Sequence, residues 1–103
     1  MRPFPHGGPP GRPVFIAHRG ASDRALENSF SAFSIAVADG ADMIEFDVRL
    51  SSDGVPVVFH DGRTGRTARE NLAVAATPAA RLRAVRLKNG EPIPTLAEVL
   101  DLV

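Results

Sequence analysis

The sequence predicts a single small α/β domain, because short apolar runs typical of strands alternate with stretches whose apolar residues recur at helical spacing. The chain has 103 residues, of which 44% are hydrophobic and 23% are charged, proportions typical of a globular domain of about 100–150 residues. Twelve Lys and Arg residues balance twelve Asp and Glu residues. The charge excess expected of a nonspecific nucleic-acid-binding protein is therefore missing.

The absence of cysteine and the hydropathy of the chain exclude several further classes of protein. The absence of cysteine excludes disulfide frameworks, thiol nucleophiles and Cys-ligated zinc. No apolar run approaches the ~18 residues of a membrane span, and the Met1 end has no apolar core of a signal peptide. We therefore expect a cytoplasmic protein without a membrane span.

The first 13 residues contain five prolines and three glycines, a composition that holds neither a helix nor a strand ladder. We predict a flexible leader over residues 1–13, with His6 solvated within it, and an ordered domain over residues 14–103. The domain opens with an apolar run, Val14 to Ala17, which predicts a buried strand ending at His18.

A helix is predicted over roughly 29–39. Asn28 or Ser29 provides an N-cap, apolar residues recur at intervals of three and four, and Gly40 suits the position after the C-cap. A strand over Met43–Leu50 follows. Strict alternation along it places Glu45 and Asp47 together on one face and the apolar residues on the other.

The Asp-Gly pair at residues 53–54, flanked by extended residues, predicts a hairpin with an antiparallel return over residues 55–60. A two-residue loop at this position would set Asp47 opposite His60. Further on, Thr77 and Pro78 predict an N-cap and first residue of a helix that reaches about Val85.

The last predicted helix begins at a capping-box pattern formed by Thr95 and Glu98. Charge is unevenly distributed before it: residues 21–61 carry eight acidic and two basic side chains, whereas residues 62–90 carry seven basic and one acidic. These two stretches are expected to attract each other. For the second stretch, a solvated basic surface is the plainer interpretation, and a rim that attracts phosphate is the alternative.

Four residues at or near predicted strand ends carry the chemistry: His18, Glu45, Asp47 and His60. The paired carboxylates are hard ligands suited to Mg²⁺ or Ca²⁺. Cleavage of a phosphate ester needs a base, an acid and a cation, and the two histidines and Arg19 complete that set. Solvated carboxylates and structural histidines explain each residue alone, but two histidines that each follow a β-rich apolar run favour a reactive site.

A family resemblance rests on seven motifs that occur in order through the domain. The motifs are His18-Arg19-Gly20-Ala21-Ser22, Glu27-Asn28-Ser29, Ile44-Glu45-Phe46-Asp47-Val48, Asp53-Gly54, Val57-Val58-Phe59-His60-Asp61, Arg66-Thr67 and Ile93-Pro94-Thr95-Leu96. Together they resemble the opening of a glycerophosphodiester phosphodiesterase.

The resemblance implies the N-terminal portion of a TIM-type (β/α)8 barrel of the PLC-like phosphodiesterase superfamily, which hydrolyses glycerophosphodiesters to sn-glycerol 3-phosphate and an alcohol. His18 and His60 match the family's general base and general acid. Glu45 and Asp47 match its Mg²⁺ or Ca²⁺ ligands, and Arg19 matches its phosphate contact. The implied mechanism begins with attack by a glycerol hydroxyl that gives a cyclic phosphate, although the residues themselves leave direct attack by water open.

The sequence departs from the family pattern in three respects. Leu26 stands where Pro is usual, Gly65 stands where a hydrophobic residue is usual, and a (β/α)8 barrel needs about 250 residues. We therefore expect a truncated barrel that lacks a third acidic ligand, is inactive alone and self-associates through an exposed edge. A non-catalytic metal- or partner-binding fragment and a sphingomyelinase-type phospholipase of the same superfamily are the alternatives.

Overall fold

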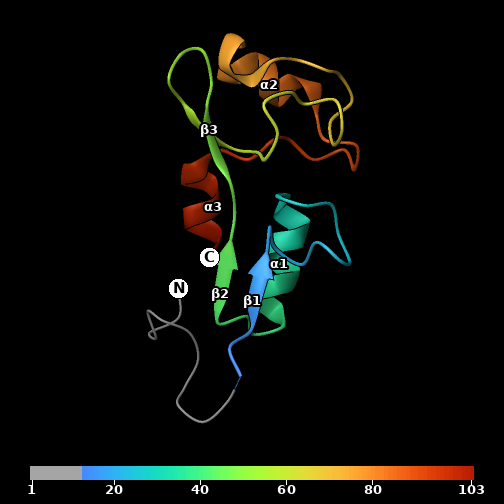
Figure 1. The fold of residues 1–103 in the computed structure, drawn as a ribbon, viewed down its shortest axis with the longest axis vertical. Coiled ribbons are helices and arrows are strands. Elements are labelled where there is room, and N and C mark those ends of the chain that lie inside the picture. The colour runs from blue at the N-terminus through green and yellow to red at the C-terminus, as the bar shows by residue number, and fades with distance from the viewer. Residues whose placement is uncertain (1–12) are drawn as a thin grey trace.

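The computed structural model describes residues 13–103, so all of the predicted leader except Pro13 lies outside the described residues. Within these residues the fold comprises three α-helices, four short strands and one 3₁₀ helix (Figure 1). In chain order the elements are β1 (Ile16–His18), α1 (Phe30–Ala38), β2 (Met43–Glu45), β3 (Val48–Leu50), β4 (Pro56–Val58), η1 (Val74–Ala76), α2 (Ala79–Val85) and α3 (Leu96–Leu102).

The first half forms a β-α-β unit in which β1 pairs in parallel with β2 and α1 lies beside the pair (Figure 1). Helix α1 agrees with the predicted range. Ser29 is its N-cap, since its hydroxyl accepts a hydrogen bond from the Ala32 N–H at 3.2 Å. Gly40, with φ 77°, follows the C-cap, and the hydrogen bonds there form a Schellman motif.

The run Val14 to Ala17 is not the buried strand that the sequence predicts. Only Ala17 of this run is buried, whereas Val14, Phe15 and Ile16 are exposed. The reason is strand pairing: among the described residues β1 pairs with β2 alone. The prediction that this strand ends at His18 is confirmed.

The single strand predicted over residues 43–50 is wrong, because the structure interrupts it at Phe46 and Asp47. Its first part, β2, pairs in parallel with β1, and its second part, β3, pairs antiparallel with β4. Phe46 packs against a core cluster, but Val48 and Leu50 are exposed. Two strand partners of opposite direction thus prevent one continuous buried face.

The antiparallel hairpin of β3 and β4 is confirmed, but its predicted register is wrong by one residue. The turn has three residues rather than two: Ser51 pairs with Val55, and Gly54, with φ 79°, donates its N–H to the Ser51 carbonyl. This geometry is typical of a type I turn followed by a left-handed residue. Asp47 is consequently linked to Phe59, whose N–H donates to its carbonyl at 3.0 Å, and does not face His60.

Helix α2 begins one residue later than predicted, with Pro78 as N-cap. The Thr77 hydroxyl does not cap α2, because it donates to the Ala73 carbonyl at 2.6 Å. The hairpin turn supplies the acceptor instead, since Asp53 Oδ1 accepts from the Ala79 N–H at 3.0 Å. The capping box at the start of α3 is present as predicted.

The buried side chains form a main core under the segments after β4 and smaller cores beside α1. The main core comprises Val57, Phe59, Ala68, Val74, Leu82, Val85, Leu87 and Ile93, and a second comprises Phe33, Val58 and Val99.

None of the helices within residues 13–103 has the length and apolar composition needed to cross a membrane.

Candidate active site

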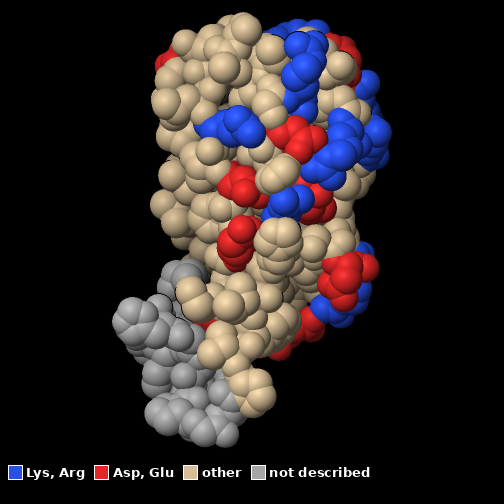
Figure 2. Space-filling view, in the orientation of Figure 1, with Lys and Arg blue, Asp and Glu red and all other residues tan. Residues whose placement is uncertain are grey.

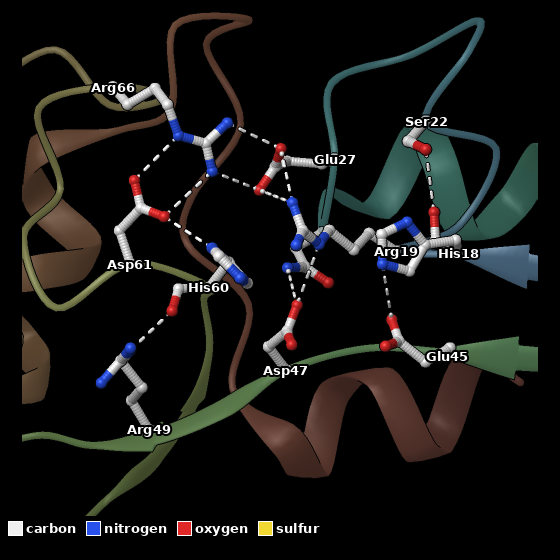
Figure 3. Close-up of polar contacts among 11 residues, drawn as sticks. His18, Arg19, Ser22, Glu27, Glu45, Asp47, Arg49, His60, Asp61 and Arg66 are labelled. Atoms are coloured by element: carbon white, nitrogen blue, oxygen red, sulfur yellow. Dashed lines mark hydrogen bonds and ion pairs between the residues drawn. The ribbon is translucent and has the colours of Figure 1, made fainter.

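The parallel pairing of β1 and β2 brings the ends of the two strands to one edge. His18 lies opposite Glu45 in the register, and His18 Nε2 lies 3.7 Å from Glu45 Oε1. Both side chains are exposed. The sheet therefore presents an imidazole and a carboxylate side by side, as Figure 3 shows.

Arg19 follows directly and turns its side chain into the site. Its backbone adopts a left-handed conformation with φ 56°. That conformation is held by hydrogen bonds from the Arg19 N–H to the Glu45 carbonyl and from the Asn28 N–H to the Arg19 carbonyl. The guanidinium lies 3.3 Å from both Glu27 and Asp47. Left-handed backbone at a residue other than glycine is costly and is concentrated at functional sites.

Asn28 is the second residue of the site in a left-handed conformation, with φ 53°. Its side chain is 3% exposed, and its Nδ2 donates to Asp47 Oδ2 at 3.1 Å. Its Oδ1 is buried without a hydrogen-bond partner. Asn28 therefore holds Asp47 in place and is not the cap of α1, a role that Ser29 takes.

His60 lies at the other side of the site, beyond the end of β4. Its Nδ1 lies 2.6 Å from Asp61 Oδ1, and its carbonyl accepts from Arg49 Nε at 2.8 Å. The hairpin register prevents the contact with Asp47 that the sequence predicted. In Figure 3 the ring of His60 nevertheless points toward the Arg19 and Asp47 side chains.

Arg66 joins the two sides. Its guanidinium forms a bidentate pair with Glu27 at 2.8 and 2.7 Å and a second pair with Asp61 at 2.8 and 3.1 Å. Hydrogen bonds from Arg66 lower the pKa of Glu27 and, together with His60, that of Asp61. The network therefore runs from Arg19 through Glu27, Arg66 and Asp61 to His60.

Sequence reasoning assigned no role in the site to Glu27, Asp61 or Arg66, although all three lie in the motifs that carry the family resemblance. The uneven charge distribution was the available signal. The expected attraction between the acidic and basic stretches is confirmed at Arg66, which comes from the basic stretch and binds two acidic residues of the other. Figure 2 shows the resulting mixture of red and blue side chains at the centre of this face.

Glu45 and Asp47 fit the oxygen-rich donor set that Mg²⁺ and Ca²⁺ prefer. Asn28, which donates a hydrogen bond to Asp47, also has a buried amide oxygen, Oδ1, without a hydrogen-bond partner. An amide oxygen is another ligand that these hard cations accept. Within residues 13–103 no cluster of three or more His, Cys, Asp and Glu side chains forms a metal site. The described part of the chain thus offers two carboxylates toward a hard cation.

Known proteins resemble this chain in both sequence and structure. A putative glycerophosphodiester phosphodiesterase of Bacillus subtilis is 44% identical over 92 residues, covering 82% of this chain and 38% of the relative. A phosphodiesterase of Oleispira antarctica, solved in complex with the product sn-glycerol-3-phosphate, superposes with a TM-score of 0.80 at 38% identity over 87% of this chain and 39% of that one. The glycerophosphodiester phosphodiesterase of Thermotoga maritima superposes with a TM-score of 0.79 at 36% identity over 89% and 40% of the two chains.

The chain therefore spans about two fifths of the length of these relatives. Its fold is that of part of a TIM-type barrel of the PLC-like phosphodiesterase superfamily, as the resemblance implied. The model of the glycerophosphoryl diester phosphodiesterase family matches residues 18–103, which include all the site residues described above. This protein belongs to the glycerophosphoryl diester phosphodiesterase family.

Proposed function

We propose that this chain contributes to the metal-dependent hydrolysis of glycerophosphodiesters to sn-glycerol 3-phosphate and an alcohol. The observation that carries the proposal is the pairing of β1 with β2, which sets His18 beside Glu45 and Arg19 beside Asp47 at one edge. His18 as base, Arg19 as cation and two carboxylate ligands at one edge, with His60 as acid at the other side of the site, meet the needs of phosphate-ester cleavage. The product bound to the Oleispira relative supports the same substrate class.

The two histidines take the proton-transfer roles. His18 is exposed and lies beside Glu45, so its ring is accessible to the attacking oxygen, from which it takes the proton. His60 is held through Nδ1 by Asp61, so when the ring is protonated at both nitrogens its Nε2–H gives the proton to the departing alkoxide, and a neutral ring with its proton on Nδ1 remains. The same groups serve a hydroxyl of the substrate or a water molecule as the attacking oxygen.

Arg19 receives the phosphate group. Its guanidinium lies 3.3 Å from Glu27, a longer contact than the 2.7 and 2.8 Å contacts that Arg66 makes to the same carboxylate. Glu27 is thus bound mainly by Arg66. Arg19 keeps donors that suit the planar, bidentate recognition of a phosphate.

Glu45 and Asp47 would hold the cation, Mg²⁺ or Ca²⁺, which when bound neutralises charge on the phosphoryl oxygens. These cations take six or more ligands, and two carboxylates leave most positions to water. We therefore expect weak binding of the metal by this chain and little or no turnover by the chain alone. The low turnover follows because a loosely held metal misplaces the reacting groups, and a misplacement of ~1 Å costs about 10²-fold in rate.

The test is release of glycerol 3-phosphate from glycerophosphocholine, measured by a coupled assay. The chain alone is compared with a chimera in which the rest of the Bacillus subtilis relative completes it, each beside His18→Ala and His60→Ala. We expect the chimera, but not the 103-residue chain, to turn over the substrate. Either substitution should abolish this turnover. A chimera that folds but releases no glycerol 3-phosphate contradicts the proposed function, whereas rapid turnover by the chain alone contradicts only its inactivity.

Two other assignments are tested with the same chimera. Release of cyclic ceramide phosphate from sphingomyelin would indicate a sphingomyelinase-type phospholipase. Metal binding without turnover in the chimera would indicate a non-catalytic fragment. A cytoplasmic location stays a prediction of the sequence, to be tested by cell fractionation.

A further inference from the structure

Arg66 has no role in the chemistry proposed above, yet it makes the most extensive polar contacts in the site. Its guanidinium binds Glu27, 39 residues away in the chain, and Asp61, 5 residues away. The side chain is 49% exposed, whereas that of Glu27 is 15% exposed. Exposed ion pairs usually contribute little to stability. Two bidentate pairs from one planar guanidinium nevertheless fix the positions of both carboxylates relative to it.

The contacts of Asp61 show what that geometry determines. Asp61 Oδ2 accepts from Arg66 Nε at 2.8 Å, and Asp61 Oδ1 lies 3.1 Å from Arg66 Nη2 and 2.6 Å from His60 Nδ1. The carboxylate is therefore fixed in the position from which it meets the His60 ring. Hydrogen bonds from Arg66 and His60 also lower the pKa of Asp61, so the carboxylate is ionised and accepts only.

An acceptor at Nδ1 selects one form of a neutral imidazole. When a carboxylate accepts at Nδ1, that nitrogen carries the proton and Nε2 keeps its lone pair. We propose that Arg66 is a positioning residue, which holds Asp61 against His60 and so keeps the proton of neutral His60 on Nδ1. Nε2 is then the atom that exchanges a proton with the substrate, a consequence that rests on the proposed function.

Glu27 explains why Arg66 remains in place. Without a second anchor, an exposed arginine would exchange its contact with Asp61 for water at little cost. Glu27 contacts Arg19 and binds both Nη atoms of Arg66, which orients Nε of Arg66 toward Asp61. Lysine, a point charge without a fork, cannot bind both carboxylates in this way.

The test is the tautomer of His60, read from the imidazole ¹⁵N chemical shifts of the labelled 103-residue chain at about pH 8, where an ordinary histidine is neutral. We expect the Nδ1–H form to dominate in the wild-type chain. Arg66→Gln should lower the ratio of the Nδ1–H form to the Nε2–H form about fivefold, the effect of weakening one hydrogen bond. Glu27→Gln, which removes the anchor, should lower the ratio less.

Arg69→Gln is the matched control, since it removes the same charge from the same segment and has no ion pair with the site residues described. Its ratio should equal that of the wild type. Asp61→Asn gives the reference for a lost carboxylate. An unchanged ratio in folded Arg66→Gln, or an equal fall in Arg69→Gln, overturns the proposal.

Arg66→Lys keeps the proposal testable if Arg66→Gln does not fold, because it retains the charge but lacks the fork; a wild-type ratio in this variant also overturns it. The measurement needs neither substrate nor metal. A chain without turnover therefore leaves this test intact, and the failure of the proposed function is distinguishable from the failure of the role of Arg66.

Discussion

Arg19 is the residue at which the fold and the chemistry of the site are most closely joined. Its backbone links the ends of two segments, through the Glu45 carbonyl and the Asn28 N–H, while its side chain lies between Glu27 and Asp47. A left-handed conformation at this position costs free energy. The surrounding hydrogen bonds offset that cost and direct the guanidinium toward the proposed phosphate site.

Arg19→Lys should therefore weaken binding of sn-glycerol 3-phosphate about tenfold or more, because lysine cannot contact a phosphate with two parallel donors. Isothermal titration calorimetry measures the change. Arg24→Lys is the control, since the exposed Arg24 pairs with Asp39 and not with Glu27 or Asp47. Equal affinity of the Arg19→Lys variant and the wild type would contradict the phosphate role.

The carboxylates of Glu27 and Asp61, which both pair with Arg66, make the free energy of unfolding depend on pH. The hydrogen bonds from Arg66 lower both pKa values from their ordinary values of 4.5 and 3.8. The unfolded chain binds more protons below these values, so the stabilisation is fully present above about pH 4.5 and is lost as pH falls through the lower pKa values of the folded chain. Urea unfolding between about pH 3 and pH 7 should show this loss in the wild type and a smaller one in Arg66→Gln; parallel curves would contradict it.

At the scale of the elements, the hairpin turn and helix α2 depend on each other. Asp53 lies in the turn between β3 and β4, yet it accepts the hydrogen bond from Ala79 N–H at the start of α2. The same side chain contacts the Ser51 hydroxyl. Pro78, the N-cap residue of α2, has no side-chain acceptor for the first N–H groups of the helix. Asp53 of the hairpin provides that acceptor instead.

Asp53→Ala should speed hydrogen exchange of the α2 amides and lower the melting temperature, because the first N–H of α2 loses its acceptor. Asp53→Asn, which retains an acceptor oxygen, should behave almost as the wild type. Exchange is followed by NMR, with the amides of α3 as an internal reference. Unchanged exchange in α2 after Asp53→Ala would show that the contact does not hold the helix.

At the scale of the whole molecule, apolar side chains remain exposed along β1. Val14, Phe15 and Ile16 are 47%, 41% and 54% exposed, and among the described residues β1 pairs with β2 alone. A strand with free backbone groups and exposed apolar residues is a template for pairing with another chain. The 103-residue chain should therefore self-associate in solution.

Ile16→Lys should shift this association toward monomer, because a charged side chain opposes edge-to-edge pairing. Light scattering coupled to size exclusion over a range of concentrations measures the mass. Val37→Lys is the matched control: Val37 is also exposed, at 47%, but lies on α1 away from the sheet edge. A monomeric wild-type chain at all concentrations would rule out the association.

Local signals in the sequence were sufficient for much of the fold. The end of β1 at His18, helix α1 with Gly40 after it, and the capping box of Thr95 and Glu98 all depend on residues within a few positions of one another. The antiparallel return after the Asp-Gly pair was also predictable. Its register was not, because contacts of the Ser51 side chain and the left-handed Gly54 lengthen the turn by one residue.

The sequence by itself determined the end of β1 at His18, the helix caps and the motifs that carry two histidines and two carboxylates, since short-range patterning sets strands, helices and caps. Only the tertiary structure decided that the strand through Asp47 is interrupted and that Arg66 binds both Asp61 and Glu27, which lies 39 residues before it in the chain. The physical reason is competition among partners. Which strand or charge a group meets depends on packing between distant segments, and no local propensity encodes that choice.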